Sequence, residues 1–223
     1  MSSLSFIYWG EIPYQDAWQR QHEIFDQKIR LKLFNETAEQ TDYFILCTHP
    51  PVYTIGRNGN RENLLVSEEE LRHLGAEFYK IDRGGDITFH GPGQVVGYPI
   101  IDLEHYHWGI KTYIYNIEEL IIRLLAMYGI RGERLEGATG VWIEPQTARA
   151  RKICAIGVRA SHYVTMHGFA LNVSTDLNWF QRINPCGFTD KGVTTMEREL
   201  GRKVETEEII LRLKSLAVEM FTL

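Results

Sequence analysis

The segment "RGGDITFHGPGQVVGYPI", residues 83–100, carries four glycines and one proline in its first eleven residues before it becomes apolar. Glycine allows positive φ and a close approach of the main chain to a ligand, and proline stiffens a turn. Gly91-Pro92-Gly93 alone predicts a tight hairpin corner. The polar side chains of Arg83, Thr88 and His90 favour a second interpretation, in which a ligand lies along this backbone. The spacing matches neither a dinucleotide-binding nor a phosphate-binding glycine loop.

Strand patterns crowd around this segment, and helical periodicity lies mostly outside it. Clustered strands with few helices between them predict an α+β fold around a mixed or antiparallel sheet. We find no repeat, low-complexity tract or Pro/Ser-rich linker, so we expect residues 1–223 to form a single domain. Strands are predicted at 43–48, 49–56, 76–82, 86–89, 94–101, 140–144, 152–160 and 163–173, and helices at 14–34, 67–75, 111–128 and 206–221.

Two helix starts have capping signals. Ser67 and Glu70 have the spacing of a capping box, and the helix that they begin is expected to stop at Gly75. Thr194 and Glu197 have the same spacing and predict another short helix.

The whole chain has the composition of an ordinary globular protein, with 44% hydrophobic and 24% charged residues among its 223. The formal net charge of −5 argues against general nucleic-acid binding. No stretch is long and apolar enough for a membrane span, and the N-terminal residues do not resemble a signal peptide. We therefore expect a cytoplasmic protein with no membrane or nucleic-acid partner.

The three cysteines are far apart and odd in number, which favours neither a disulfide framework nor a zinc site. Cys47 and Cys154 lie in apolar strand patterns, where thiols behave as small hydrophobes. Cys186 lies in a Pro-Cys-Gly turn, where a nucleophilic thiolate and an inert loop thiol are equally good interpretations. Neither His90 nor His167 has a nearby His or Cys at metal-ligand spacing, so we predict no metal site and no cofactor.

A second dense segment, "RKICAIGVRASHYVTMHGFALNV", spans residues 151–173. Lys152 taken alone is typical of a solvated face, and one histidine on a strand is more often structural than catalytic. Residues 146–159 contain Arg149, Arg151 and Arg159 besides Lys152 and no acidic residue. This stretch is either a basic docking surface or an ordinary solvated loop.

Together these segments resemble the lipoyl(octanoyl) transferase family. Its motifs RGG-x-x-T-x-H-G-P-G-Q, K-I-x-x-I-G, T-x-H-G-x-A-L-N-V and P-C-G match residues 83–94, 152–157, 165–173 and 185–187, and "HPPVYTIGR" at 49–57 resembles its early strand. The chain has Phe89 where tyrosine is common in the family, which puts one hydrogen bond in doubt.

The resemblance implies the fold of biotin and lipoate protein ligases, a class II synthetase-like mixed sheet flanked by helices. It implies transfer of an octanoyl or lipoyl group from acyl carrier protein to a lysine of lipoyl domains, in 2-oxoacid dehydrogenases and the glycine-cleavage H protein. Cys186 then corresponds to the acyl-thioester nucleophile and Lys152 to the lysine that lowers its pKa. The implied substrate-binding residues are Arg83, Gly84, Gly85, Asp86, Ile87, Thr88, Phe89, His90, Ala155, Ile156, Gly157, Gly168, Phe169 and Ala170.

Chemical reasoning favours the same assignment over two alternatives. A thioester donor suits a cysteine relay, because thioester exchange is nearly isoenergetic and formation of the amide then runs downhill. An ATP-dependent lipoate or biotin ligase of the same fold needs no nucleophilic cysteine, so Cys186 argues against it. A binding module without catalysis would not need both Cys186 and Lys152.

Overall fold

The computed structural model describes residues 3–34, 41–184 and 191–222, and within these ranges the core is one mixed eight-stranded sheet. Its strand order is β1-β2-β6-β10-β9-β8-β7, and β11 pairs with β9. The β1–β2 and β9–β11 pairs are parallel and the other pairs are antiparallel, so the predicted mixed sheet is confirmed. The strands are β1 Leu4–Glu11, β2 Asp42–Thr48, β6 Gln94–Ile100, β7 Glu133–Leu135, β8 Ala138–Ile143, β9 Arg151–Ser161, β10 Val164–Asn172 and β11 Gly192–Val193.

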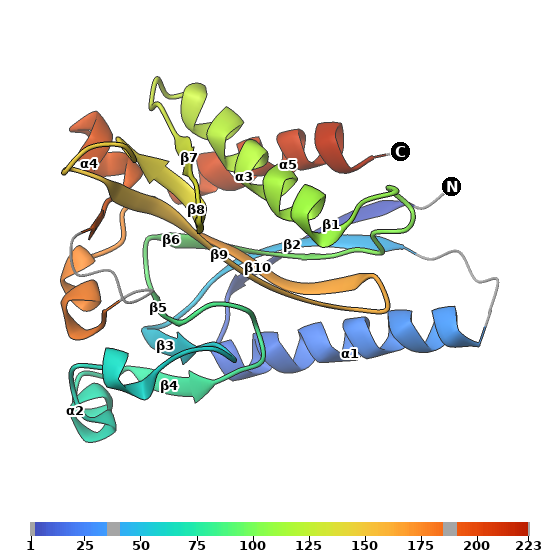
Figure 1. Cartoon of the computed structure of the whole chain (residues 1–223), viewed down its shortest axis with the longest axis horizontal. Coiled ribbons are helices and arrows are strands. Elements are labelled where there is room, and N and C mark those ends of the chain that lie inside the picture. The colour runs from blue at the N-terminus through green and yellow to red at the C-terminus, as the bar shows by residue number, and fades with distance from the viewer. Residues whose placement is uncertain (1–2, 35–40, 185–190, 223) are drawn as a thin grey trace.

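Helices cover both faces of this sheet, with α3 (Ile110–Ala126) and α5 (Thr206–Phe221) on one side and α1 (Tyr14–Leu33) on the other (Figure 1). The strands are buried on both faces, so they are apolar at successive positions. In β2, Phe44 and Leu46 pack in the cluster beneath α3 and α5, and Ile45 and Cys47 pack against α1. The α+β architecture predicted from the clustered strands is therefore confirmed.

A smaller sheet, in the order β4-β3-β5, lies beside the N-terminal half of α1 (Figure 1). It contains β3 Val52–Ile55, β4 Glu77–Lys80 and β5 Ile87–His90, together with α2 (Glu68–His73) and the 3-10 turn Arg61–Asn63. Its own apolar cluster includes Tyr53, Leu71 and Phe180, the last from the 3-10 helix Leu177–Arg182. This sheet carries the glycine-rich segment up to the edge of the main sheet.

One predicted helix cap is confirmed and the other is off by one residue. The Ser67 hydroxyl accepts the Glu70 N–H at 3.1 Å, and the Glu70 carboxylate accepts the Ser67 N–H at 2.8 Å. The short helix α4 (Met196–Leu200) is capped by Thr195, whose hydroxyl accepts the Arg198 N–H. Thr194 does not cap it, because its hydroxyl donates to Glu199 instead.

The long helices begin and end within about three residues of their predicted bounds, because each has a continuous apolar face and a clear stop. Gly75 and Gly129 follow α2 and α3 with φ of 73° and 75°, the left-handed conformation that ends helices. Among the helices of the described residues, none is both long and apolar enough to cross a membrane.

Candidate active site

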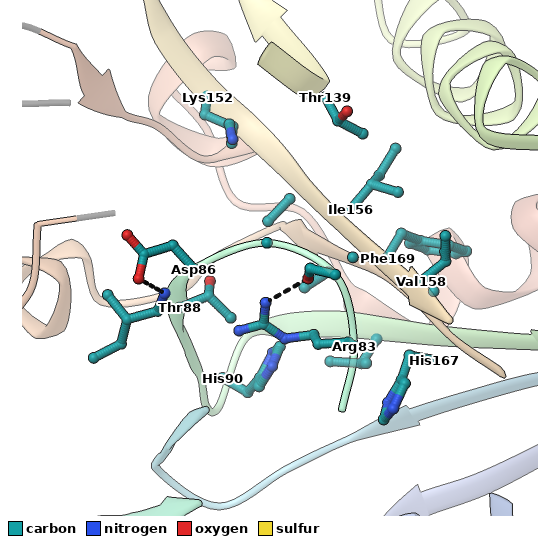
Figure 2. Close-up of a pocket in the computed structure, with 18 of the residues that line it drawn as sticks. Arg83, Asp86, Thr88, His90, Thr139, Lys152, Ile156, Val158, His167 and Phe169 are labelled. Atoms are coloured by element: carbon teal, nitrogen blue, oxygen red, sulfur yellow. Dashed lines mark hydrogen bonds between the residues drawn. The ribbon is translucent and has the colours of Figure 1, made fainter. Parts of the chain in front are cut away.

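A cavity of about 470 Å³ opens between strands β9 and β10, the 83–85 turn, the β7–β8 hairpin and helix α3. The two motif segments that fall within the described residues meet here, although they are some 70 residues apart in the chain. Figure 2 shows side chains from both segments around the same space. The predicted substrate-binding residues that line it are Arg83, Gly84, Gly85, Asp86, Ile87, Thr88, His90, Ala155, Ile156, Gly157, Gly168, Phe169 and Ala170.

The central part of the cavity wall is a ladder of small residues across two strands. Antiparallel pairing places Ala155 opposite Ala170 and Gly157 opposite Gly168. A Cβ atom on Gly168 would lie 2.1 Å from the carbonyl oxygen of Gly97 on β6, so only glycine fits there. Side chains no larger than methyl at these four positions leave the main chain of both strands open to the cavity.

The Arg83-Gly84-Gly85 turn docks directly onto β9. The N–H of Gly84 donates to the Val158 carbonyl at 2.9 Å, and a Cβ on Gly157 would lie 2.9 Å from the Gly84 carbonyl oxygen. The Arg83 guanidinium is buried and donates to the carbonyl and hydroxyl of Thr54 at 2.7 and 3.0 Å. Arg83 therefore locks the turn against β3 as well as lining the cavity.

Asp86 organises the loop that precedes helix α2. One carboxylate oxygen accepts the N–H groups of Ile87 at 2.7 Å and Asn60 at 3.2 Å, and the other accepts the side-chain amide of Asn63. Three donors from two segments of the chain hold the carboxylate in one orientation. Asp86 thus shapes one wall of the cavity.

Phe89 is the one predicted substrate-binding residue that does not line the cavity. Its ring is fully buried on the other side of β5, where it stacks on Trp179 at 5.1 Å and also contacts Tyr53 and Phe180. Strand alternation explains the difference, because Thr88 and His90 point to the cavity and the residue between them points away. A tyrosine at position 89 would therefore place its hydroxyl in this aromatic cluster and not in the cavity.

His90 is fixed as a neutral hydrogen-bonding residue. Its Nδ1 lies 2.8 Å from Gln94 Oε1, and the Gln94 amide nitrogen donates to Asn172 and to the Phe89 carbonyl. Because the glutamine oxygen accepts, His90 Nδ1 must carry the hydrogen. Burial lowers the pKa of His90 to about 3. His90 is therefore a poor candidate for the general base.

His167 is held by a carboxylate. Its Nε2 lies 2.8 Å from Asp82 Oδ1, and Arg159 pairs with the other oxygen of Asp82. The hydrogen bond from His167 lowers the pKa of Asp82 to about 2, and burial lowers the pKa of His167 itself. His167 is thus neutral at pH 7 with the Nε2–H tautomer, beside an ionised partner.

Lys152 lines the cavity at the end of β9, where strands pair with it on both sides. It is opposite Trp142 of β8 and Val193 of β11, and its carbonyl accepts the Thr194 N–H at 3.0 Å. Its ammonium lies 4.6 Å from the centre of the Trp142 ring, a cation–π contact. The lysine is therefore placed at the cavity by two separate segments of the chain, β8 and residues 193–194.

Cys186 lies outside the described residues, and the chain on both sides of segment 185–190 is fixed beside the cavity. Before it, Asn184 donates to the Asn63 carbonyl at 2.8 Å, and Phe180 lines the cavity. After it, Val193 lines the cavity next to Lys152. The strand cysteines, Cys47 and Cys154, are fully buried, and burial raises the pKa of both thiols.

Several cavity residues carried no signal in the sequence. Gly137, Ala138 and Thr139 of the β7–β8 hairpin and Ile110 and Ile114 of α3 complete the walls. The hairpin is held over the cavity by Glu118 of α3, which accepts the Gly140 N–H at 3.0 Å. Residues of this kind join the site only through tertiary packing, so no local pattern marks them.

The basic stretch at 146–159 does not form an uncompensated positive surface. Arg151 pairs with Glu144 and Glu199 at 2.6 Å each, and Arg149 pairs with Glu144 at 2.9 Å. Arg159 pairs with Asp82. These contacts favour a structural role for the arginines over the docking surface that we considered from the sequence.

Comparison with known proteins identifies relatives along nearly the whole chain. The family model described as the lipoyl protein ligase A/B catalytic domain matches residues 13–216. An octanoyltransferase of Bacteroides fragilis is 56% identical over 205 residues, which cover 92% of each chain. An octanoyltransferase of Parabacteroides distasonis is 51% identical over 222 residues, covering 99% of this chain and 100% of that one.

Solved structures show the same fold at much lower identity. A bipartite lipoate protein ligase from Thermoplasma acidophilum has a TM-score of 0.72 at 15% identity, covering 99% of this chain and 84% of that one. A lipoate-protein ligase A bound with ATP has a TM-score of 0.69 at 14% identity, covering 99% and 85%. The ligase-like fold expected from the resemblance is therefore confirmed.

The buried histidines predict that the protein loses stability in mild acid. Burial lowers the pKa of His49 to about 4 and that of His90 to about 3. In the unfolded chain both histidines take up a proton near pH 6.5, whereas in the folded protein they stay neutral down to about pH 4. The free energy of unfolding is therefore unaffected by them above pH 6.5 and decreases as the pH falls from 6.5 towards 4. Each histidine should cost about 1.4 kcal/mol per pH unit in this window.

Denaturant unfolding between pH 7.5 and 5 measures this slope. In the His90→Gln variant, the pH slope of the free energy of unfolding should be smaller by the contribution of about one proton, whatever the stability of the variant at pH 7.5. An unfolding free energy that is flat over this range in the wild-type protein would contradict the assignment of His49 and His90 as neutral buried groups.

Proposed function

The chain belongs to the lipoyl protein ligase A/B catalytic family, whose relatives at 50–56% identity are octanoyltransferases, and we propose how its residues carry out octanoyl transfer. The octanoyl group comes from an acyl carrier protein and passes to a specific lysine of a lipoyl domain. We propose that the whole chain works as one catalytic domain in the cytoplasm, with 2-oxoacid dehydrogenases and the glycine-cleavage H protein as acceptors. The observation that carries the proposal is a cavity lined by the two described motif segments, with Lys152 at its end.

The first half-reaction moves the acyl group to Cys186. The thiolate of Cys186 attacks the carbonyl carbon of the donor thioester, the bond from that carbon to the carrier sulfur breaks, and the carrier leaves as a thiolate that takes up the proton that Cys186 gave up. A cation beside the cysteine favours its thiolate form. Lys152 supplies that cation, which is supported by the pairing of Val193, close after the Cys186 segment, with Lys152.

The second half-reaction moves the acyl group to the acceptor. The amine of the acceptor lysine attacks the enzyme thioester, an amide C–N bond forms, and the bond to Cys186 sulfur breaks. Lys152 in its neutral form takes the amine proton and returns a proton to the sulfur. The two motif histidines are engaged elsewhere, His90 with Gln94 and His167 with Asp82, which favours Lys152 as the base.

The acyl chain lies along the small-residue ladder. Ala155, Gly157, Gly168 and Ala170 open the main chain to the cavity, and Ile156, Val158 and Phe169 offer apolar contacts. Burial of each methylene in such a site contributes about 0.8 kcal/mol. The cavity therefore favours an apolar acyl group.

An ATP-dependent ligase is the alternative that the fold leaves open. Such ligases activate a free acid as an adenylate, so they need ATP and no cysteine nucleophile. Relatives at 55–56% identity are octanoyltransferases, which favours the thioester route.

We predict a covalent octanoyl adduct on Cys186. Incubation with octanoyl-acyl carrier protein, without ATP, should add one octanoyl group to the intact mass. Cys186→Ala should abolish the adduct, and Cys47→Ala and Cys154→Ala should keep it, because both strand thiols are buried with raised pKa values. An adduct mapped to either strand cysteine, or a strict requirement for ATP, would refute the proposal.

Lys152→Arg separates the two roles of the lysine. Arginine keeps the positive charge but cannot give up its proton. Acylation of Cys186 should therefore stay within about threefold of wild type, and transfer to a lipoyl domain should slow by about 100-fold. Single-turnover assays measure the two steps separately. If wild type and Lys152→Arg transfer the acyl group from Cys186 to the lipoyl domain at equal rates, Lys152 is excluded as the base.

A further inference from the structure

Lys152 reaches the cavity through an irregularity in the pairing of β8 with β9. Val141 pairs with Cys154, but the next residue of β8 pairs with Lys152, so one residue of β9 is extra. That residue is Ile153, and it forms a β-bulge, which changes the face to which the strand directs its side chains. Ile153 and Cys154 both pack in the cluster beneath α3 and α5, although regular alternation would send only one of them there. The bulge therefore turns Lys152 to the other face.

Trp142 lies on the same face as Lys152. Directly paired residues share a face, and the neighbours of Trp142 in β8, Val141 and Ile143, pack in the cluster on the opposite face. The Trp142 side chain is 1% exposed, and its Nε1–H donates to the Ala138 carbonyl at 2.9 Å. Burial and this hydrogen bond together hold the indole ring in one orientation.

The side chain of Lys152 runs past a glycine before it reaches this ring. Figure 2 shows Lys152 at the end of the cavity where Thr139 of β8 lies. A Cβ atom on Gly140 would lie 3.4 Å from Cε and 3.5 Å from Cδ of Lys152, so the lysine methylenes are packed against this position. The ammonium then lies over the Trp142 ring, 4.6 Å from its centre. The ring quadrupole attracts a cation more strongly than a neutral amine, so the contact favours the charged form of the lysine.

Other charged and titratable groups also surround Lys152, and the carboxylates among them are engaged. Glu118 of α3 binds Arg134 and the Gly140 N–H, and Asp86 binds donors of its own loop. The described charged and titratable side chains on the elements packed around Lys152 are Arg83, Asp86, His90, Glu118, Glu144, Arg151, Cys154 and Glu199. Their ion pairs and hydrogen bonds do not involve Trp142, so a change to its ring leaves them in place.

We propose that Trp142 is a positioning residue that sets the balance between the two roles of Lys152. The ring stabilises the ammonium, the form that supports the Cys186 thiolate, and it disfavours the neutral amine, the form that accepts the proton of the incoming lysine. This inference rests on the proposed octanoyl transfer and deepens it. The bonds that form and break are those of the two half-reactions, and Trp142 exchanges no proton.

Graded fluorination of the Trp142 ring tests the contact without changing its shape. Cell-free synthesis with a chemically acylated suppressor tRNA places tryptophan, or its mono-, di- or trifluoro derivative, at position 142 alone. Each fluorine weakens the negative potential of the ring face and keeps the N–H that binds Ala138. Trp142→Leu is less suitable, because loss of a fully buried ring leaves a cavity and destabilises the fold.

The first measurement is the charge state of Lys152 itself. Trace acetic anhydride labels only neutral amines, and mass spectrometry follows labelling of Lys152 against pH, with the exposed Lys203 as internal reference. The pH of half-maximal labelling of Lys152 should fall with each fluorine, by about half to one pH unit over the series. The reference should not move.

The second measurement is the rate of each half-reaction at pH 7, in single turnovers with the intact enzyme. Formation of the octanoyl adduct should slow about three- to tenfold over the series, because a less favoured ammonium supports less thiolate. Transfer from the adduct to a lipoyl domain should become faster by a similar factor, because more of Lys152 is neutral. Opposite changes in the two steps are not expected from general damage to the fold.

The matched control is the same fluorinated series at Trp9. Arg20 lies 5.6 Å from the centre of the Trp9 ring, a second cation–π contact that is outside the cavity. Fluorination there should leave the labelling of Lys152 and both half-reactions unchanged.

A Lys152 labelling curve that stays constant over the Trp142 series would overturn the inference, and so would two half-reactions that slow together. If octanoyl transfer proceeds normally in wild type while either of these results is found, only this inference fails. If wild type forms no octanoyl adduct, the proposed function fails, and the catalytic role of Trp142 fails with it even where the labelling of Lys152 shifts.

Discussion

The register between β9 and β10 is the constraint on which the site depends. It sets Gly157 opposite Gly168 and Ala155 opposite Ala170, so that two adjacent strands offer bare main chain to one space. The same small residues permit two close approaches, the 83–85 turn onto β9 and the Gly97 backbone onto β10. Close packing tolerates no added methyl group at such contacts. A one-residue slip would move the ladder to the other face and close the cavity.

A chain of polar contacts links this ladder to the strand end where Lys152 lies. Asn172, at the end of β10, accepts from Gln94 and donates to the Thr194 carbonyl at 3.1 Å. The Thr194 hydroxyl donates to Glu199, which also binds Arg151. Arg151, which precedes Lys152 in β9, is thus anchored through buried and half-buried contacts. These contacts give the basic stretch at 146–159 a structural role, because the ion pairs of Arg151 hold the beginning of β9 in place.

Local patterns in the sequence predicted most elements, because helices and strands here have continuous apolar faces. The motif resemblance predicted which segments build the cavity. Neither could predict that Asp82 meets His167, because the two are 85 residues apart and the contact depends on a left-handed backbone inside a strand. Phe89 was misplaced for a related reason: a motif lists consecutive residues, whereas a strand sends alternate side chains to opposite faces.

The most direct test of the account concerns the ladder itself. Ala155→Val adds two methyl groups to the cavity wall opposite Ala170 and leaves Lys152 and the motif glycines in place. Carrier proteins loaded with butanoyl, hexanoyl and octanoyl groups then compete for transfer to one lipoyl domain. The account predicts that kcat/KM for octanoyl falls at least about tenfold relative to butanoyl, as expected for lost apolar contact and crowding. A chain-length profile identical to that of wild type would contradict it, because the acyl group would then lie elsewhere.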